Sequence, residues 1–469
     1  MSIERKYNRL IELFKEVSSI PRNSGEEGRI AEYLCEFAKA RNLWYKKDEY
    51  NNVIIKKEAP QGSEDKKAIL FQAHTDMVCE KTETSSHDFT KDPIELIIDG
   101  DIIKAKDTTL GADDGIGVAF LLLMLEEENN RKIECLFTTE EETGMDGAKS
   151  FKYEDIDSSY LINLDGEEED TAIVGCAGGV KLNYTKKVEI EKVNINGYKL
   201  SISNLAGGHS GVDIDKKRVN ANFLMASVLK NLKNVRIESF NGGTKDNAIA
   251  RSASCTFYSE SKDIKASVNS IITIFKFVSE DKNLKVNIEE VELKNLMSKE
   301  DSMNVLDILL TLKQGVIDMS KSKDGLVESS GNIGKVEIEN GNISIIESLR
   351  SSIDIKRDEY KLENNNIAKK YGYEVLENGE YPGWQYKEKS KLRDEYIKAY
   401  KLTHDEKEPI ICAIHAGVEC GIIYEKLPHL DMISLGPDVK NVHTTEEILE
   451  LNSCKKLIKT LDVLMNNLD

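Results

Sequence analysis

The stretch IGVAFLLLMLEEENNRKIECLFT, residues 116–138, decides the fold class. Residues 116–125 are intensely apolar and predict a buried helix. A charged turn follows, and the apolar run Ile133–Thr138 predicts a buried strand. A buried helix that leads directly into a buried strand is typical of an α/β sheet covered by helices.

The surrounding sequence extends this pattern in both directions. Short apolar runs at residues 52–56, 68–73 and 160–164 predict further strands, and longer segments lie between the last strands. Residues 5–19 predict an amphipathic helix, and Ser24 with Glu27 three residues later predicts a capping box that opens a second helix. Asp99-Gly100 in LIIDGDIIKA predicts a hairpin turn. We therefore expect an α/β catalytic domain with a mostly parallel sheet flanked by helices.

The chain has 469 residues, which is too long for one ordinary hydrophobic core. After about residue 187 the sequence pattern changes to short strand-like segments that alternate with predicted helices and polar loops. This predicts an inserted α+β domain over residues 188–383. The strand–helix alternation returns afterwards, so residues 1–187 and 384–469 are expected to form one split domain.

Composition excludes several classes of partner and site. The net charge of −19 argues against nucleic acid and anionic membranes as partners. The longest apolar stretch, residues 118–125, is far shorter than the ~20 residues that span a bilayer. The amino-terminal residues contain no apolar signal core, and the eight cysteines form no C-x-x-C pair, so we expect a cytoplasmic protein with reduced thiols. Any metal site must then use histidines and carboxylates.

Candidate ligands of this kind follow the predicted strands or precede the predicted helix. They are His74, Asp76, Asp113, Asp114, Glu140, Glu141, Glu142, Asp165 and His443. The carboxyl edge of an open α/β sheet is where ligands bind. Carboxylates that converge there repel one another unless cations neutralise them. Two histidines with three or more carboxylates suit a pair of zinc ions, or manganese or cobalt.

Each of these residues also has a structural interpretation when taken alone. An H-x-D pair at a strand end is more often structural, and the acidic run at residues 140–142 would usually form a solvated face. Asp113-Asp114-Gly115 could serve only as a helix N-cap. We interpret residues 167–170 as a solvated face, and His404 and His429 as surface residues. The metal-site hypothesis depends on the conjunction of the strand-end residues.

Eight motifs resemble one known group of enzymes. They are QAHTDMV, TTLGADDGIGVA, TTEEETGMDGA, LINLDGEEE, GGHSGVDI, FNGGTKDNAIAR, IHAGVECGI and the pair SLGP and VH. They are similar to the co-catalytic zinc metallopeptidases of the aminoacylase/carboxypeptidase superfamily, and most of all to the bacterial cytosolic Xaa-His dipeptidases. The motif order matches from about residue 5 to the carboxyl terminus.

The resemblance implies roles for the metal-binding residues. His74 and Asp165 would bind one ion, and Glu142 and His443 would bind the other. Asp113 would bridge both ions, and the resemblance also implies a cis peptide bond after it.

The resemblance implies further roles around the metals. Asp76 would orient His74, and Glu141 would be the general base that activates a metal-bridging water. In the inserted domain, His209 would stabilise the oxyanion. Asn247 and Arg350 would hold the free carboxylate of the substrate.

Two departures from the family pattern leave the register of the site open. Glu140 stands where relatives usually have threonine, and Asp114 stands where they often have asparagine. The roles of Glu141 and Glu142 depend on this alignment, and the bridging role could fall to Asp114 in place of Asp113.

The implied function is metal-dependent hydrolysis of dipeptides, with carnosine-like Xaa-His substrates and broad acceptance. The inserted domain would act as a lid and could form a homodimer. Two alternatives remain: an aminotripeptidase or related amidohydrolase, and a non-catalytic peptide- or metal-binding relative. The presence of Glu141 argues against the second, because a binding module has no need of a base.

Overall fold

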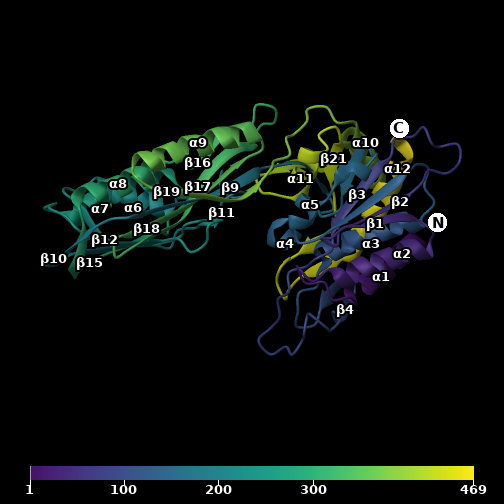
Figure 1. Ribbon diagram of the computed structural model, residues 1–469, viewed down its shortest axis with the longest axis horizontal. Coiled ribbons are helices and arrows are strands. Elements are labelled where there is room, and N and C mark those ends of the chain that lie inside the picture. The colour runs from purple at the N-terminus through teal and green to yellow at the C-terminus, as the bar shows by residue number, and fades with distance from the viewer. Residues whose placement is uncertain (1, 469) are drawn as a thin grey trace. The chain divides into compact units, whose positions relative to one another are not determined.

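The computed structural model describes residues 2–468, which divide into two compact units (Figure 1). Within the described residues, the first unit comprises residues 2–175, 386–413 and 418–468. The second unit comprises Cys176–Gln385 and Ile414–Gly417. Each unit encloses a hydrophobic cluster of its own.

The first unit contains an eight-stranded sheet, a smaller four-stranded sheet and the helices around them. Its elements are α1 (Ile3–Ser18), α2 (Gly28–Ala40), β1 (Trp44–Lys47), β2 (Val53–Lys57), β3 (Ile69–His74), β4 (Leu96–Asp99), β5 (Ile102–Ala105), α3 (Ala112–Glu126), β6 (Ile133–Thr138), α4 (Glu141–Gly144), α5 (Asp146–Ser150), the short 3₁₀ helix η1 (Tyr153–Asp155), β7 (Tyr160–Asn163), β8 (Thr171–Cys176), α10 (Lys391–Thr403), β20 (Ile410–Ile414), α11 (Glu419–Lys426), β21 (Asp431–Ser434), β22 (Val439–Lys440), β23 (Ile448–Glu450) and α12 (Leu451–Asn467).

The large sheet has the strand order β1-β2-β6-β3-β7-β21-β8-β20. The expected parallel arrangement holds for its four central strands, β6, β3, β7 and β21. The strands β1 and β2 at one side, and β8 at the other, pair antiparallel. Every residue of β3, β6 and β7 is buried, because helices cover both faces of the sheet.

The apolar stretch at residues 116–125 forms most of α3, as predicted. This helix lies against α1 on one side and against β3 and β6 on the other (Figure 1). Because it is enclosed from all sides, its sequence has no polar face. The loop before α3 is thereby brought to the carboxyl ends of the central strands.

The second unit is an α+β unit in which a long antiparallel sheet carries helices. Its elements are β9 (Gly178–Lys187), β10 (Ile190–Ser203), β11 (Gly208–His209), α6 (Ala221–Lys230), β12 (Arg236–Gly242), β13 (Ala248–Ile249), β14 (Ala253–Tyr258), α7 (Ile264–Val278), β15 (Lys285–Met297), α8 (Lys299–Thr311), β16 (Gly315–Met319), β17 (Val327–Glu339), β18 (Asn342–Ser351), α9 (Asp354–Lys370) and β19 (Glu374–Tyr381).

The sheet of the second unit has the order β15-β10-β14-β12-β17-β18-β9-β19, and β16 pairs with β17. The helices α6, α8 and α9 pack against it, and burial alternates along β18 and along β14. This alternation is expected for antiparallel strands that have one covered face. The short strands β11 and β13 form a separate pair.

The first division between the units falls at Gly175, not at the expected residue 187. The reason is β9, which pairs along its full length with β18 and also with β19. Its hydrogen bonds therefore place residues 178–187 in the second sheet. Residues 414–417 also join the second unit, late in the chain.

Candidate functional site

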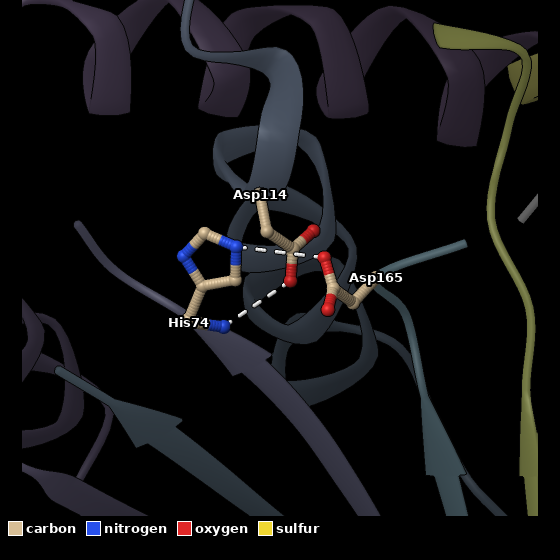
Figure 2. A group of neighbouring side chains, drawn as sticks. All are labelled: His74, Asp114 and Asp165. Carbon is tan, nitrogen blue, oxygen red and sulfur yellow. Dashed lines mark hydrogen bonds and ion pairs between the residues drawn. The ribbon is translucent and has the colours of Figure 1, made fainter. Parts of the chain in front are cut away.

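Three parallel strands of the first unit end at the same edge, and each leads into a candidate residue. His74 is the last residue of β3 and is in register with Thr138, the last residue of β6. Gln72 of β3 is in register with Asn163, the last residue of β7. Residues that directly follow β6 and β7 are thus carried to the side of His74. Figure 2 shows that His74 and Asp165 meet beyond these strand ends. Nε2 of His74 lies 3.5 Å from Oδ1 of Asp165.

Asp113 lies between two histidines that are 369 positions apart in the sequence (443 − 74). Its Oδ1 is 3.0 Å from Nε2 of His74, and its Oδ2 is 3.1 Å from Nε2 of His443. Oε1 of Glu142 is 2.9 Å from the same atom of His443. One carboxylate therefore faces two separate groups of ligand-type atoms, as a bridging ligand would.

Asp114 has a different environment. Its fully buried carboxylate accepts hydrogen bonds from the backbone N–H of His74 (3.2 Å, Figure 2) and of Gly117 (3.1 Å). The Asp113-Asp114 peptide bond is cis. Asp114 holds backbone groups while Asp113 spans the two histidines, so the geometry favours Asp113 for the bridging position.

Asp76 is buried and acts as an acceptor for the turn after β6. Its Oδ1 accepts the backbone N–H of Glu141 (3.1 Å) and lies 3.3 Å from Nδ1 of His74. Its Oδ2 accepts the backbone N–H of Glu142 (3.2 Å) and the hydroxyl of Ser24 (2.8 Å). Asp76 thus contacts His74 and also positions the two glutamates.

The predicted capping box at Ser24 is wrong. The helix α2 begins at Gly28, and the hydroxyl of Ser24 donates to Asp76 instead. Oε1 of Glu27 accepts from the backbone N–H of Gly25 (2.9 Å) and of Glu140 (3.1 Å). The buried carboxylate of Asp76 requires donors, and satisfying it outweighs a local helix cap.

The three glutamates after β6 separate into different environments. The backbone of Glu140 is left-handed, with φ of 56°, which turns the chain sharply. Glu142 reaches His443, whereas the half-buried carboxylate of Glu141 forms no hydrogen bond or ion pair within the described residues. Glu140 belongs to none of the groups of ligand-type atoms found in the described region. Glu141 is thus the glutamate that lies beside His74 without being bound by a hydrogen bond or an ion pair within the described residues.

The electrostatics of the cluster show an excess of negative charge. Burial raises the pKa of Asp165 to about 6 and also raises the pKa of Glu141, and neighbouring carboxylates add to both shifts. Burial would raise the pKa of Asp113 as well, but contacts with His443 and His74 lower it overall. Crowded acids with imidazoles form a donor set that fits divalent cations. Oxygen and nitrogen atoms of these residues lie within 4.8 Å of one another in three groups: His74, Asp114 and Asp165; His74, Glu141 and Glu142; Asp113, Glu142 and His443.

Two buried residues that sequence reasoning missed support the loop that carries Asp113. The carboxylate of Glu447 accepts the backbone N–H groups of residues 110–113 at 2.8–3.3 Å. The guanidinium of Arg22 donates to the carbonyls of Thr75 (3.1 Å), Asp76 (3.0 Å) and Gly111. The only local signal was that Glu447 lies four residues after His443.

The sequence profile described as Peptidase family M20/M25/M40 matches residues 70–467. The chain belongs to this family. The chain is 36% identical over 457 residues to the cytosol non-specific dipeptidase of Escherichia coli K12, which covers 95% of this chain and 94% of that protein.

Solved structures agree with this assignment. The aminoacylhistidine dipeptidase of Vibrio alginolyticus matches with a TM-score of 0.93 and 32% identity, over 98% of this chain and 96% of that one. The aminopeptidase PepT of Bacillus cereus shares the fold, with a TM-score of 0.57 and 17% identity over 98% of both chains. The expected family, α/β fold with an inserted domain, and peptide-bond hydrolase activity are confirmed. Among the helices described, none is long and apolar enough to cross a membrane.

The second unit of this M20 peptidase gathers the other predicted residues. His209 on β11 is in register with Ala248 on β13, the residue after Asn247. The carbonyl of Asn247 accepts from the backbone N–H of Ser210 (2.9 Å), so His209 and Asn247 lie close together in the backbone pairing. Nη1 of Arg350 donates to the hydroxyl of Tyr381 at 2.7 Å, and its buried Nε has no hydrogen-bond partner among the described residues. Burial lowers the pKa of His209, and the nearby Arg350 lowers it further.

His415 and Glu419 belong to one short motif but to different units. Nε2 of His415 lies 2.7 Å from the hydroxyl of Ser330, and burial, with Arg350 nearby, lowers its pKa to about 3. Glu419 is fully buried under the strand ends of the first unit, and burial raises its pKa to about 7.

The prediction that His404 is a surface residue is wrong. His404 is buried, and its ring stacks on Tyr400 at 3.9 Å between centroids. Its Nε2 is 3.0 Å from Oε1 of Glu169, so the predicted solvated face at residues 167–170 is also wrong for Glu169. Both side chains enter the core by long-range packing that no local pattern reveals.

Proposed function

We propose that this M20 peptidase is a cytoplasmic, metal-dependent dipeptidase that cleaves Xaa-His substrates and accepts other dipeptides. The observation that carries the proposal is the carboxylate of Asp113, which spans His74 and His443. Similarity to a cytosol non-specific dipeptidase and to an aminoacylhistidine dipeptidase supports the substrate class.

Two divalent cations would be held by five side chains. His74 and Asp165 would bind one cation, Glu142 and His443 would bind the other, and Asp113 would bind both. The mixture of imidazole and carboxylate ligands suits zinc, with manganese or cobalt as substitutes. When bound, such cations polarise the scissile carbonyl and lower the pKa of water.

Glu141 is the group that would transfer the proton. Its carboxylate is free of hydrogen bonds and ion pairs within the described region, while its backbone is fixed by Asp76. Burial raises its pKa, which makes the carboxylate a stronger proton acceptor. Glu141 would accept a proton from the attacking water and deliver it to the leaving amine. Asp76 would orient His74 through its Nδ1 atom.

Residues of the second unit would recognise the rest of the substrate, and this unit would serve as the lid. His209 would donate a hydrogen bond to the oxyanion. Arg350 and Asn247 would hold the terminal carboxylate, since an arginine fork matches a carboxylate well. The hydrogen bond from Arg350 to Tyr381 would orient this fork.

We also propose that the second unit forms a homodimer. The carboxyl-terminal end of α7 exposes Ile274 (57%), Phe277 (85%) and Val278 (58%). Beside it lies a cavity of about 310 Å³, lined in part by Phe223, Phe275 and Val278. Apolar side chains that gather in this way on a surface are typical of a protein interface.

The proposal is tested by supplying the metal-free protein with zinc, manganese or cobalt and assaying a peptide panel. The panel contains Xaa-His dipeptides such as β-alanyl-histidine, other dipeptides, tripeptides and tetrapeptides. We expect metal-dependent cleavage of dipeptides with a preference for histidine at the second position. Preferential cleavage of tripeptides would favour the aminotripeptidase alternative, and absence of cleavage with two bound metals would favour a binding protein.

A further inference from the structure

The carboxylate of Glu419 is completely buried and is a member of none of the proposed ligand sets. Glu419 is the first residue of α11, which lies against α5 in the first unit. Its position beneath the strand ends requires an explanation, because a buried carboxylate is costly unless it accepts strong hydrogen bonds.

Glu419 receives two short hydrogen bonds from neighbouring strands. Its Oε2 accepts from Nε2 of Gln72 on β3 at 2.6 Å and from the hydroxyl of Thr138 on β6 at 2.7 Å. Oε1 of Gln72 in turn accepts from Nδ2 of Asn163 on β7 at 2.8 Å. Nε2 of Gln72 also lies 3.0 Å from the hydroxyl of Thr138. The carboxylate thus joins β3 and β6 directly, and Gln72 extends the network to β7.

The three linked strand residues directly precede the candidate site. Gln72 lies two positions before His74, and Asn163 lies two positions before Asp165. Side chains two positions apart on a strand share a face, so Gln72 and His74 point the same way. Thr138 lies three positions before Glu141, at the start of the turn.

We propose that Glu419 is a positioning residue that sets the spacing of the strand ends carrying His74, Asp165 and Glu141. The inference rests on the proposed two-metal function. Without the carboxylate, the donors of Gln72 and Thr138 lose a buried acceptor, and the Gln72 side chain that carries the link to Asn163 is no longer held in place. The ligands would then have to be ordered by the metals themselves, which weakens metal binding.

The test compares Glu419→Ala with Glu419→Gln, because glutamine keeps an oxygen that can accept from Gln72 and Thr138. Zinc affinity is measured by chelator competition, together with kcat, KM and the unfolding midpoint of the metal-free protein. We expect Glu419→Ala to weaken zinc binding about 10–100-fold, and Glu419→Gln to recover most of this loss. KM for a dipeptide at saturating zinc should change less than kcat.

Glu347→Gln is the matched control for a change at a buried carboxylate. Glu347 is also fully buried, but it lies in the second unit, where it accepts from Tyr184 (2.6 Å) and Asn364 (2.8 Å). Its replacement should leave zinc affinity unchanged. If Glu419→Ala lowers the unfolding midpoint but keeps wild-type zinc affinity, the positioning role is refuted.

A milder variant keeps the test decisive if Glu419→Ala does not fold. Thr138→Val preserves the side-chain shape and removes one of the two hydrogen bonds to Glu419, so it should weaken zinc binding several-fold. Unchanged zinc affinity in a folded Thr138→Val protein would also count against the proposal. Failure of the wild type to bind zinc or cleave dipeptides would instead refute the proposed function, before any variant is compared.

Discussion

The backbone N–H of Glu141 donates to Oδ1 of Asp76, and the same oxygen lies 3.3 Å from Nδ1 of His74. One buried carboxylate therefore positions both the proposed base and a proposed ligand. Because Oδ2 also accepts the N–H of Glu142, the turn after β6 is held at two successive residues. This arrangement lets adjacent glutamates take different roles.

Replacing Glu141 by glutamine should separate catalysis from metal binding. Glutamine keeps the shape of the side chain but cannot accept a proton, so turnover should fall roughly 10²–10⁴-fold. Zinc content, measured by atomic emission, should stay at the wild-type level. Glu140→Gln is the matched control and should retain activity. An inactive Glu140→Gln with an active Glu141→Gln would show that the register is shifted by one.

Replacing Asp113 by alanine should remove both metals. Asp113 alone faces both His74 and His443, so its loss affects both proposed ions. Glu142→Ala should mainly weaken the ion bound with His443. Equilibrium dialysis against zinc, followed by metal analysis, measures both outcomes. If Asp113→Ala retained two ions, this result would indicate that Asp114 is the bridging ligand.

Replacing Arg350 by alanine should impair cleavage of dipeptides that have a free carboxylate. The corresponding dipeptide amide has no carboxylate to pair, so its cleavage should barely change. The wild type should strongly prefer the acid, because a longer or amidated substrate leaves the guanidinium unpaired. Comparison of kcat/KM for the acid and the amide, in both proteins, measures the effect. Equal wild-type rates for acid and amide would rule out the carboxylate clamp.

Replacing Phe277 by glutamate should disrupt the proposed homodimer. Phe277 is 85% exposed, so the charge should leave the fold of one subunit intact. We expect light scattering to give a dimer for the wild type and a monomer for the variant. Lys265→Glu, on the same helix, is the control and should remain dimeric. A wild-type monomer at micromolar concentration would refute the interface.

The buried Glu347 should make stability fall between about pH 4.5 and 7. Burial raises its pKa in the folded protein to about 7, from an ordinary 4.5, so folding favours the protonated form. The contribution of the protonated Glu347 to the free energy of unfolding is complete below pH 4.5. It is lost as the pH rises through 7, at up to ~1.4 kcal/mol per pH unit. Glu347→Gln does not titrate, so its stability relative to wild type should rise over this range.

Denaturant unfolding at several pH values, followed by circular dichroism, measures this difference. Glu339 is exposed and lies on the neighbouring strand β17. The free energy of unfolding of Glu339→Gln should therefore differ from that of wild type by the same amount at every pH. A constant difference between Glu347→Gln and wild type from pH 4.5 to 7 would contradict the assignment.

The α/β class could be predicted from the sequence, because short apolar runs such as Ile133–Thr138 alternate with longer helical segments. Histidines and carboxylates near the strand ends also indicated a metal site, and the resemblance to a known family singled out His74, Asp113, Glu142, Asp165 and His443 among them. The fold class and the type of site follow from local periodicity and residue type, which a sequence displays directly.

The tertiary structure decided which neighbouring acid faces which group. Only the folded chain shows Asp113 between two histidines and Asp114 bound to backbone N–H groups. The hydroxyl of Ser24 donates to Asp76 and does not cap a helix. The strand β9 belongs to the second sheet because it pairs with β18, which is distant in the sequence. These features depend on contacts between residues that are far apart in the chain, because buried polar groups must form hydrogen bonds with whatever partners the fold brings near. Local sequence patterns do not reveal such contacts.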